Sequence, residues 1–343
     1  TEHMRFSGRA GPGLRWSYRG HTTWLVQHNC SKLGRHAYAF SLTTIPQRMA
    51  HLAPGLQSLA GQQQPPRLIV VTIVRYYPHA GGSSSGQSPS LAKMYKIINA
   101  EAEVSGLRQR GTLLHIAQVE TDLGPATKLL GTWQAVGIVP WLCGVVIVDD
   151  DLIYSPNLWN EYLSHILLNL YESVRSVPSS FEQLPKRCPP CLTLYCGKCK
   201  ERNNLMAVRT RARVPHVQGA DSYFLPTSCF AKAVARQQFE HLVHWAFNQL
   251  PDFFFFDDYV ISAALYCWNI GVQRVRLSAI PAYSTVASTK ASRYARDIQH
   301  SQLHRLKGRS ERERKVQMFI GNNITAICQQ ARNQHIPHGI SDS

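Results

Sequence analysis

The sequence lacks a long hydrophobic run. Its longest apolar stretch, from Gly137 to Val148, is interrupted by Pro140 and is well short of the ~20 residues that a membrane-spanning helix needs. This excludes a transmembrane segment within the sequence. The first thirty residues also lack the apolar centre of a signal peptide, so we expect any targeting signal or anchor to lie outside it. Localisation stays open between the cytoplasm and, if an anchor is missing, the Golgi lumen.

Acidic residues are scarce. There are 21 Asp and Glu against 37 Lys and Arg, which gives a formal net charge of +16. Charged residues make up only 17% of the chain and hydrophobic residues 44%, which excludes a disordered polycation. The charge indicates anionic partners. The length of 343 residues allows one large α/β domain or two smaller ones.

Internal repeats are absent as well, and four apolar runs instead alternate with helical patterns. Residues 1–35 are rich in Gly, Arg and His, which predicts a flexible basic N-terminal arm. The predicted strands are Ala37–Leu42, Leu68–Val74, Leu113–Val119 and Val145–Val148. Strands that alternate with helices predict an α/β fold, with a mostly parallel central sheet flanked by helices and a ligand site outside the carboxyl ends of the strands.

The second half of the chain is less regular. Apolar residues at helical spacing predict helices over 158–174 and 261–268, and short β-like segments occur at 192–195 and 222–225. We predict one domain over 36–290, with a Cys/Pro-rich insertion at 178–205. Residues 291–343 form a predicted basic C-terminal helical segment.

The strongest chemical signal is a buried strand that runs into three acids, Asp149, Asp150 and Asp151. Adjacent carboxylates repel one another unless they share a cation, and Mg²⁺ or Mn²⁺ prefers carboxylate oxygen. Strand alternation predicts that Asp149 and Asp151 face one way, as metal ligands, and that Asp150 faces the other. The alternative is a solvated acidic turn.

Three segments together resemble GT-A fold glycosyltransferases, in particular the inverting, family-2-like enzymes that use nucleotide sugars. The segments are Phe40–Arg48 with the following helix and strand, Asp122–Leu130, and the acidic triplet, which resembles the Asp-x-Asp motif. The resemblance covers roughly residues 38 to 155. It implies a single GT-A domain, a nucleoside-diphosphate-sugar donor and a divalent metal, Mn²⁺ or Mg²⁺, bound by Asp149 and Asp151.

The resemblance also implies residues that attend the nucleotide. These are Thr43, Pro46, Arg48, Asp122, Gly124, Lys128 and Asp149. Lys128 would add positive charge beside the diphosphate. The alternatives are that Lys128 is a surface lysine and that Thr43, Pro46 and Arg48 only shape a strand-to-helix turn.

The second half supplies an acidic pair, Asp257 and Asp258, after a run of four Phe. It resembles the pair whose second member deprotonates the acceptor hydroxyl in inverting enzymes, so Asp258 is the candidate base. The alternative is an N-cap with a first-turn acid. Asp221 is a weaker candidate site residue. Since some family members complete the metal shell with a late His, we include His300.

Two CxxC pairs, formed by Cys188, Cys191, Cys196 and Cys199, would suffice for a tetrahedral structural Zn²⁺ site. Only four residues separate the pairs, which is fewer than zinc ribbons usually have. Disulfides and unligated thiols therefore remain as alternatives, and none of the three supplies a catalytic group.

We therefore predict a metal-dependent, inverting glycosyltransferase that moves a sugar to a hydroxyl acceptor on a glycan, lipid or protein. A retaining enzyme that uses the acidic pair only to bind the acceptor is the alternative mechanism. Two rivals remain. One is a nucleic-acid-binding module, which the charge favours but which leaves the three acids unexplained. The other is a catalytically inactive glycosyltransferase-like binding protein.

Overall fold

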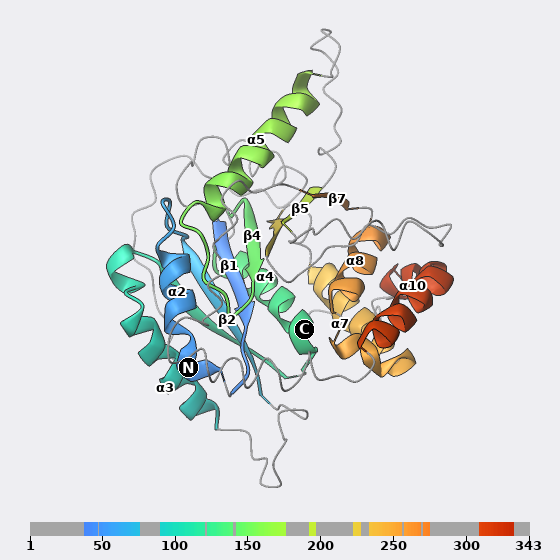
Figure 1. Ribbon diagram of the computed structural model, residues 1–343, viewed down its shortest axis with the longest axis horizontal. Helices are drawn as coiled ribbons and strands as arrows, with labels where there is room; N and C mark the ends of the chain where they lie inside the picture. The colour runs from blue at the N-terminus through green and yellow to red at the C-terminus, as the bar shows by residue number, and fades with distance from the viewer. Residues whose placement is uncertain are drawn as a thin grey trace, which may run out of the picture.

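The computed structural model describes eleven ranges of the chain, and in them seven strands form one sheet between layers of helices (Figure 1). The described residues are 38–46, 48–75, 90–120, 122–139, 142–175, 192–196, 222–227, 233–255, 257–268, 270–274 and 309–332. Among them, no helix has the length and apolar character that crossing a membrane requires.

One half of the sheet is parallel, in the order β3-β2-β1-β4. These strands are β1 (Tyr38–Thr43), β2 (Leu68–Val74), β3 (Leu113–Val119) and β4 (Gly144–Val148). Every residue of β2 and β4 is buried, as is typical of parallel strands that are covered on both faces. The four strands predicted from the sequence are confirmed.

The other half of the sheet adds β6 (Ser222–Pro226), β5 (Leu192–Cys196) and β7 (Gly271–Arg274), in that order beyond β4. β6 is antiparallel to both β4 and β5, whereas β7 is parallel to β5. All described strands except β6 therefore run in one direction. The predicted mostly parallel α/β sheet is confirmed, and it is consistent with a Rossmann-like GT-A fold.

Helices cover both faces of the sheet. Side chains alternate along β1, so Tyr38 and Ser41 lie on opposite faces and each contacts a different helix. On one face the Ser41 hydroxyl donates to the Lys128 carbonyl of α4 (Thr127–Ile138) at 2.7 Å. On the other, the Tyr38 ring stacks on Trp159 of α5 (Leu158–Arg175), with centroids 3.9 Å apart. α2 (Ala53–Ala60) lies on the α5 side, where Gln62, just after it, accepts from the Trp159 amide. α3 (Leu91–Val104) packs on α2.

A second helical layer lies beyond α4 (Figure 1). It contains α7 (Ala233–Gln249), α8 (Asp257–Cys267) and α10 (Arg309–Arg332). Short 3-10 turns are η1 (Met49–His51), η2 (Arg108–Arg110), η3 (Gly124–Ala126) and η4 (Pro251–Phe255). α10 lies within residues 291–343, and it packs directly on α7 and α8.

Two glycines allow close packing around the parallel strands. A Cβ on Gly131 of α4 would lie 2.1 Å from the Ser41 Oγ, and one on Gly144 of β4 would lie 2.0 Å from the Phe224 ring. Both distances are far below van der Waals contact. Glycine therefore lets α4 lie directly on β1 and β2 and lets the Phe224 ring lie over the start of β4.

Candidate functional site

The candidate site forms where β1 and β4 end, because parallel neighbours deliver their carboxyl ends to the same edge of the sheet. After β1, the chain turns and presents Arg48. After β4, it presents the acidic triplet. The Arg48 Nη1 lies 2.7 Å from the Asp150 Oδ1 and 3.4 Å from the Asp151 Oδ2. One guanidinium thus binds two of the three acids across 102 residues of sequence.

The third acid, Asp149, binds a lysine of α4. Lys128, in the first turn of α4, places its Nζ 2.9 Å from the Asp149 Oδ1. The Lys128 side chain is only 5% exposed, and the contact between Ser41 and its carbonyl fixes its backbone. Lys128 is therefore not a surface lysine, and the sequence-based alternative for it is wrong.

The prediction that strand alternation turns Asp150 away from its neighbours is also wrong. β4 ends at Val148, and Asp150 and Asp151 lie in a turn, so the two-residue period of a strand does not apply to them. Both carboxylates instead converge on Arg48. The alternative of a solvated acidic turn is excluded as well, because the Asp150 side chain is only 5% exposed.

Tyr154 closes the acidic turn, a role that sequence reasoning missed. Its hydroxyl accepts from the Asp149 amide at 2.7 Å and donates to the Asp149 carbonyl at 3.3 Å. Burial and the neighbouring Asp149 charge raise the pKa of Tyr154, so the phenol stays protonated and can donate. The Tyr154 amide in turn donates to Ser58 of α2. The only sequence signal is an aromatic residue soon after the triplet.

Among the described residues, the site has a negative excess, since three carboxylates face two cations. Burial raises the pKa of Asp151 to about 6, with the neighbouring acids adding to that effect and Arg48 opposing it. The Asp150 carboxylate raises the pKa of Arg48 further above its usual range, so Arg48 stays charged. The Asp150 Oδ2 is buried and has no hydrogen-bond partner among the described residues.

These features test whether a divalent cation fits the site. The predicted donors, the Asp149 and Asp151 carboxylates, are hard oxygen ligands, and each also contacts a basic side chain. The described residues contain no group of three His, Cys, Asp or Glu side chains placed to hold a metal ion. Mg²⁺ is commonly held by one or two carboxylates together with substrate phosphates and water, so a divalent ion fits this donor set.

The remaining predicted nucleotide residues shape the loops around the site. The Asp122 carboxylate accepts from the Gly124 amide at 2.8 Å. Gly124 has a φ of 59°, in the left-handed region that favours glycine. Thr43 donates to the Thr72 carbonyl at 3.0 Å, and Pro46 lies in a turn closed by the bond from the Arg48 amide to the Ile45 carbonyl. Their contacts to a nucleotide stay predictions.

The predicted acidic pair opens α8, and α8 packs against η3, the turn that leads into the helix of Lys128. Asp258 is half-buried, and its carbonyl accepts from the Ser262 hydroxyl. The side chain of Asp257 lies outside the described residues. So do Asp221, His300, Cys188, Cys191 and Cys199, while Cys196 is described only by the backbone of β5. The zinc site and the late metal ligand therefore stay predictions.

Comparisons with known proteins find only distant structural similarity. No family model and no curated protein matches it. Among solved structures, it is similar to glucosyl-3-phosphoglycerate synthase from Mycobacterium tuberculosis at 11% identity, with 76% of each chain covered and a TM-score of 0.34. It is similar to UTP-bound UGPase from Acinetobacter baumannii at 12% identity, with 82% of this chain and 98% of that chain covered and a TM-score of 0.32. Likeness at this level does not identify an activity.

Proposed function

We propose that the protein is a glycosyltransferase that moves a sugar from a nucleoside-diphosphate donor to a hydroxyl acceptor. One observation carries the proposal: the carboxyl edge of a parallel sheet brings Arg48, Lys128 and the acidic triplet into one cluster. Ligands of such sheets bind at this edge. The sequence resemblance to GT-A enzymes supports the choice of donor.

The cluster can bind a diphosphate only if a cation also binds there. Three carboxylates against two basic side chains would repel a polyanion. A bound divalent ion would reverse the sign and supply the positive charge that neutralises the departing diphosphate. Asp149 and Asp151 are the proposed ligands, with Asp150 holding Arg48 beside them, and His300 is the proposed further ligand.

Asp258 is the proposed general base. A carboxylate within hydrogen-bond reach of the acceptor hydroxyl would take its proton as the hydroxyl attacks the sugar carbon. The bond to the diphosphate oxygen then breaks on the opposite face, which inverts the configuration. The packing of α8 on η3 supports this role, because it places the helix that begins with the acidic pair against the segment that leads to Lys128.

A turnover and binding assay tests the proposal. UDP- and GDP-sugars are offered with and without Mn²⁺ to the wild type and to Asp151→Ala, and donor hydrolysis is measured. We expect turnover that needs Mn²⁺ and that falls at least about a hundredfold in the variant. The matched control is Glu120→Gln, which should behave as the wild type. Glu120 is an exposed acid just after β3 and pairs with Arg75.

The outcomes separate the rival functions. Mn²⁺-independent turnover, or an unchanged Asp151→Ala, contradicts the metal assignment. Nucleotide-sugar binding without turnover indicates an inactive binder. Tight nucleic-acid binding with a steep salt dependence and no nucleotide-sugar binding favours the nucleic-acid module. Where transfer occurs, the anomeric configuration of the product tests inversion.

A further inference from the structure

Helix α10 is held against the helix that carries the proposed base. Its buried residues recur along one face, at Val316, Ile320, Ile327 and Ala331, and it packs on α7 and α8. In Figure 1, α10 lies beside α7 and α8, on the far side of α4 from α2 and α3. Although residues 268–308 separate it from α8 in sequence, α10 is part of the same helical layer.

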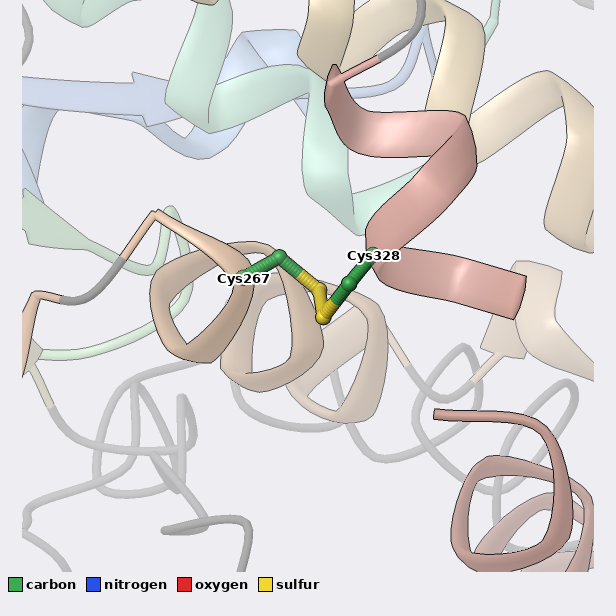
Figure 2. The surroundings of a disulfide bond; sticks show 2 residues. All are labelled: Cys267 and Cys328. Carbon is green, nitrogen blue, oxygen red and sulfur yellow. A yellow bond between two sulfur atoms is a disulfide. The ribbon is translucent and has the colours of Figure 1, made fainter. Parts of the chain in front are cut away.

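Covalent and polar contacts secure α10 at the two ends of α8. A disulfide joins Cys267, the last residue of α8, to Cys328 (Figure 2). At the opposite end, the Tyr259 hydroxyl donates to the Glu313 Oε1 at 2.8 Å and accepts from the Gln317 Nε2. Tyr259 is only 3% exposed, while Glu313 and Gln317 are half-buried.

The polar end of this attachment adjoins Asp258. Tyr259 directly follows Asp258 in the first turn of α8. The turn before α8, η4, is also held by α10. The Arg312 Nη1 of α10 lies 3.2 Å from the Asp252 Oδ1 of η4. The first turn of a helix has few intrahelical hydrogen bonds of its own amides, so outside contacts decide how firmly it is placed.

We propose that Glu313 and Gln317 of α10 are positioning residues that fix Asp258 through Tyr259. This inference rests on the proposed function, since it assigns a purpose to the position of the base. Two hydrogen bonds to one hydroxyl hold the Tyr259 side chain against α10, and Tyr259 lies in the first turn of α8. A general base tolerates little displacement, because a shift of about 1 Å in a reacting group costs on the order of a hundredfold in rate.

The test compares variants that change these bonds while keeping the packing. Tyr259→Phe removes both hydrogen bonds but retains the ring, Glu313→Ala removes the acceptor, and Glu313→Gln restores an oxygen that can accept. Glu311→Ala is the matched control, because it lies on the same helix in an exposed pair with Lys315. We measure kcat, the donor KM, and hydrogen exchange of the amides over 257–262.

For Tyr259→Phe, which loses two modest hydrogen bonds, we expect kcat to fall about tenfold, and for Glu313→Ala, which loses one, about threefold. The donor KM should stay within about twofold of the wild type in both variants. Exchange over 257–262 should become faster. Glu313→Gln should recover most of both effects, and Glu311→Ala should show neither. If Tyr259→Phe and Glu313→Ala both keep the kcat of the wild type, the proposal is overturned, whether or not hydrogen exchange over 257–262 changes.

The two readouts distinguish this inference from the proposed function. If the wild type transfers no sugar, the proposed function fails, and with it the assignment of Asp258 as a base. The exchange measurement still decides whether α10 orders the first turn of α8. Unchanged exchange in Tyr259→Phe and Glu313→Ala would overturn that structural part independently of any activity.

Discussion

Replacing Gly131 with alanine tests how closely α4 lies on the sheet. An added Cβ would lie 2.1 Å from the Ser41 Oγ, 2.8 Å from the Thr72 Oγ1 and 3.2 Å from the Val70 Cγ1. Ser41 would have to rotate, and it would lose its 2.7 Å bond to the Lys128 carbonyl. The substitution therefore affects both the core and the backbone that carries Lys128.

The magnitude follows from three opposing contributions to the free energy of unfolding. Losing the buried hydrogen bond costs about 1 kcal/mol, and overpacking costs about 1–3 kcal/mol. The higher helix propensity of alanine returns about 1 kcal/mol. We expect Gly131→Ala to lower the free energy of unfolding by about 1–3 kcal/mol.

Urea denaturation followed by circular dichroism measures this change, and the same helix supplies the control. Gly137 is exposed, and a Cβ there would meet nothing within 4 Å. Gly137→Ala should therefore raise the free energy of unfolding, by up to about 1 kcal/mol. If Gly131→Ala proves as stable as the wild type, or shifts in the same direction as Gly137→Ala, α4 does not pack on β1 and β2 as described.

Three further predictions concern charge and covalent linkage. Because the pKa of Asp151 rises from 3.8 to about 6 on folding, its contribution to stability is present below pH 4 and is lost as the pH rises through 6. The wild type should therefore lose stability relative to Asp151→Asn between pH 4 and pH 6. Parallel pH profiles of the two proteins in urea denaturation would contradict this. Arg48→Ala leaves the Asp150 carboxylate buried without its partner and should cost about 3 kcal/mol; an additional Asp150→Asn should recover part of the loss, whereas additive losses would refute the pairing. Cys328→Ser opens a loop with a sequence separation of 61 from Cys267 and should lower the free energy of unfolding by up to about 4 kcal/mol; an unchanged midpoint of thermal unfolding would contradict that.

Much of the parallel half of the sheet could be predicted from sequence, for a physical reason. The buried strand Gly144–Val148 is a continuous apolar run, and the three acids directly after it place charge at the sheet edge. The sequence does not predict helix α3, because its buried residues, Met94, Ile98 and Ala102, form only a narrow stripe. The sequence likewise gave no expectation of α7 or β7.

The pairings within the site could not be predicted in the same way. The contact between Arg48 and Asp150 joins residues 102 apart, and it depends on β1 and β4 lying side by side. The sequence also suggested a strand period through the triplet, which holds only while the chain remains extended. The disulfide was not foreseen, because nine cysteines allow many pairings and spacing alone does not choose among them.

The bond between Cys267 and Cys328 changes what a break in the chain would mean. A protease that cuts once between these two positions would produce two polypeptides still joined through sulfur. The nicked protein would keep its original mass apart from one added water molecule. The C-terminal fragment would become a separate molecule only after reduction. Until then α10 would stay covalently attached to α8, even though the peptide chain between them is cut.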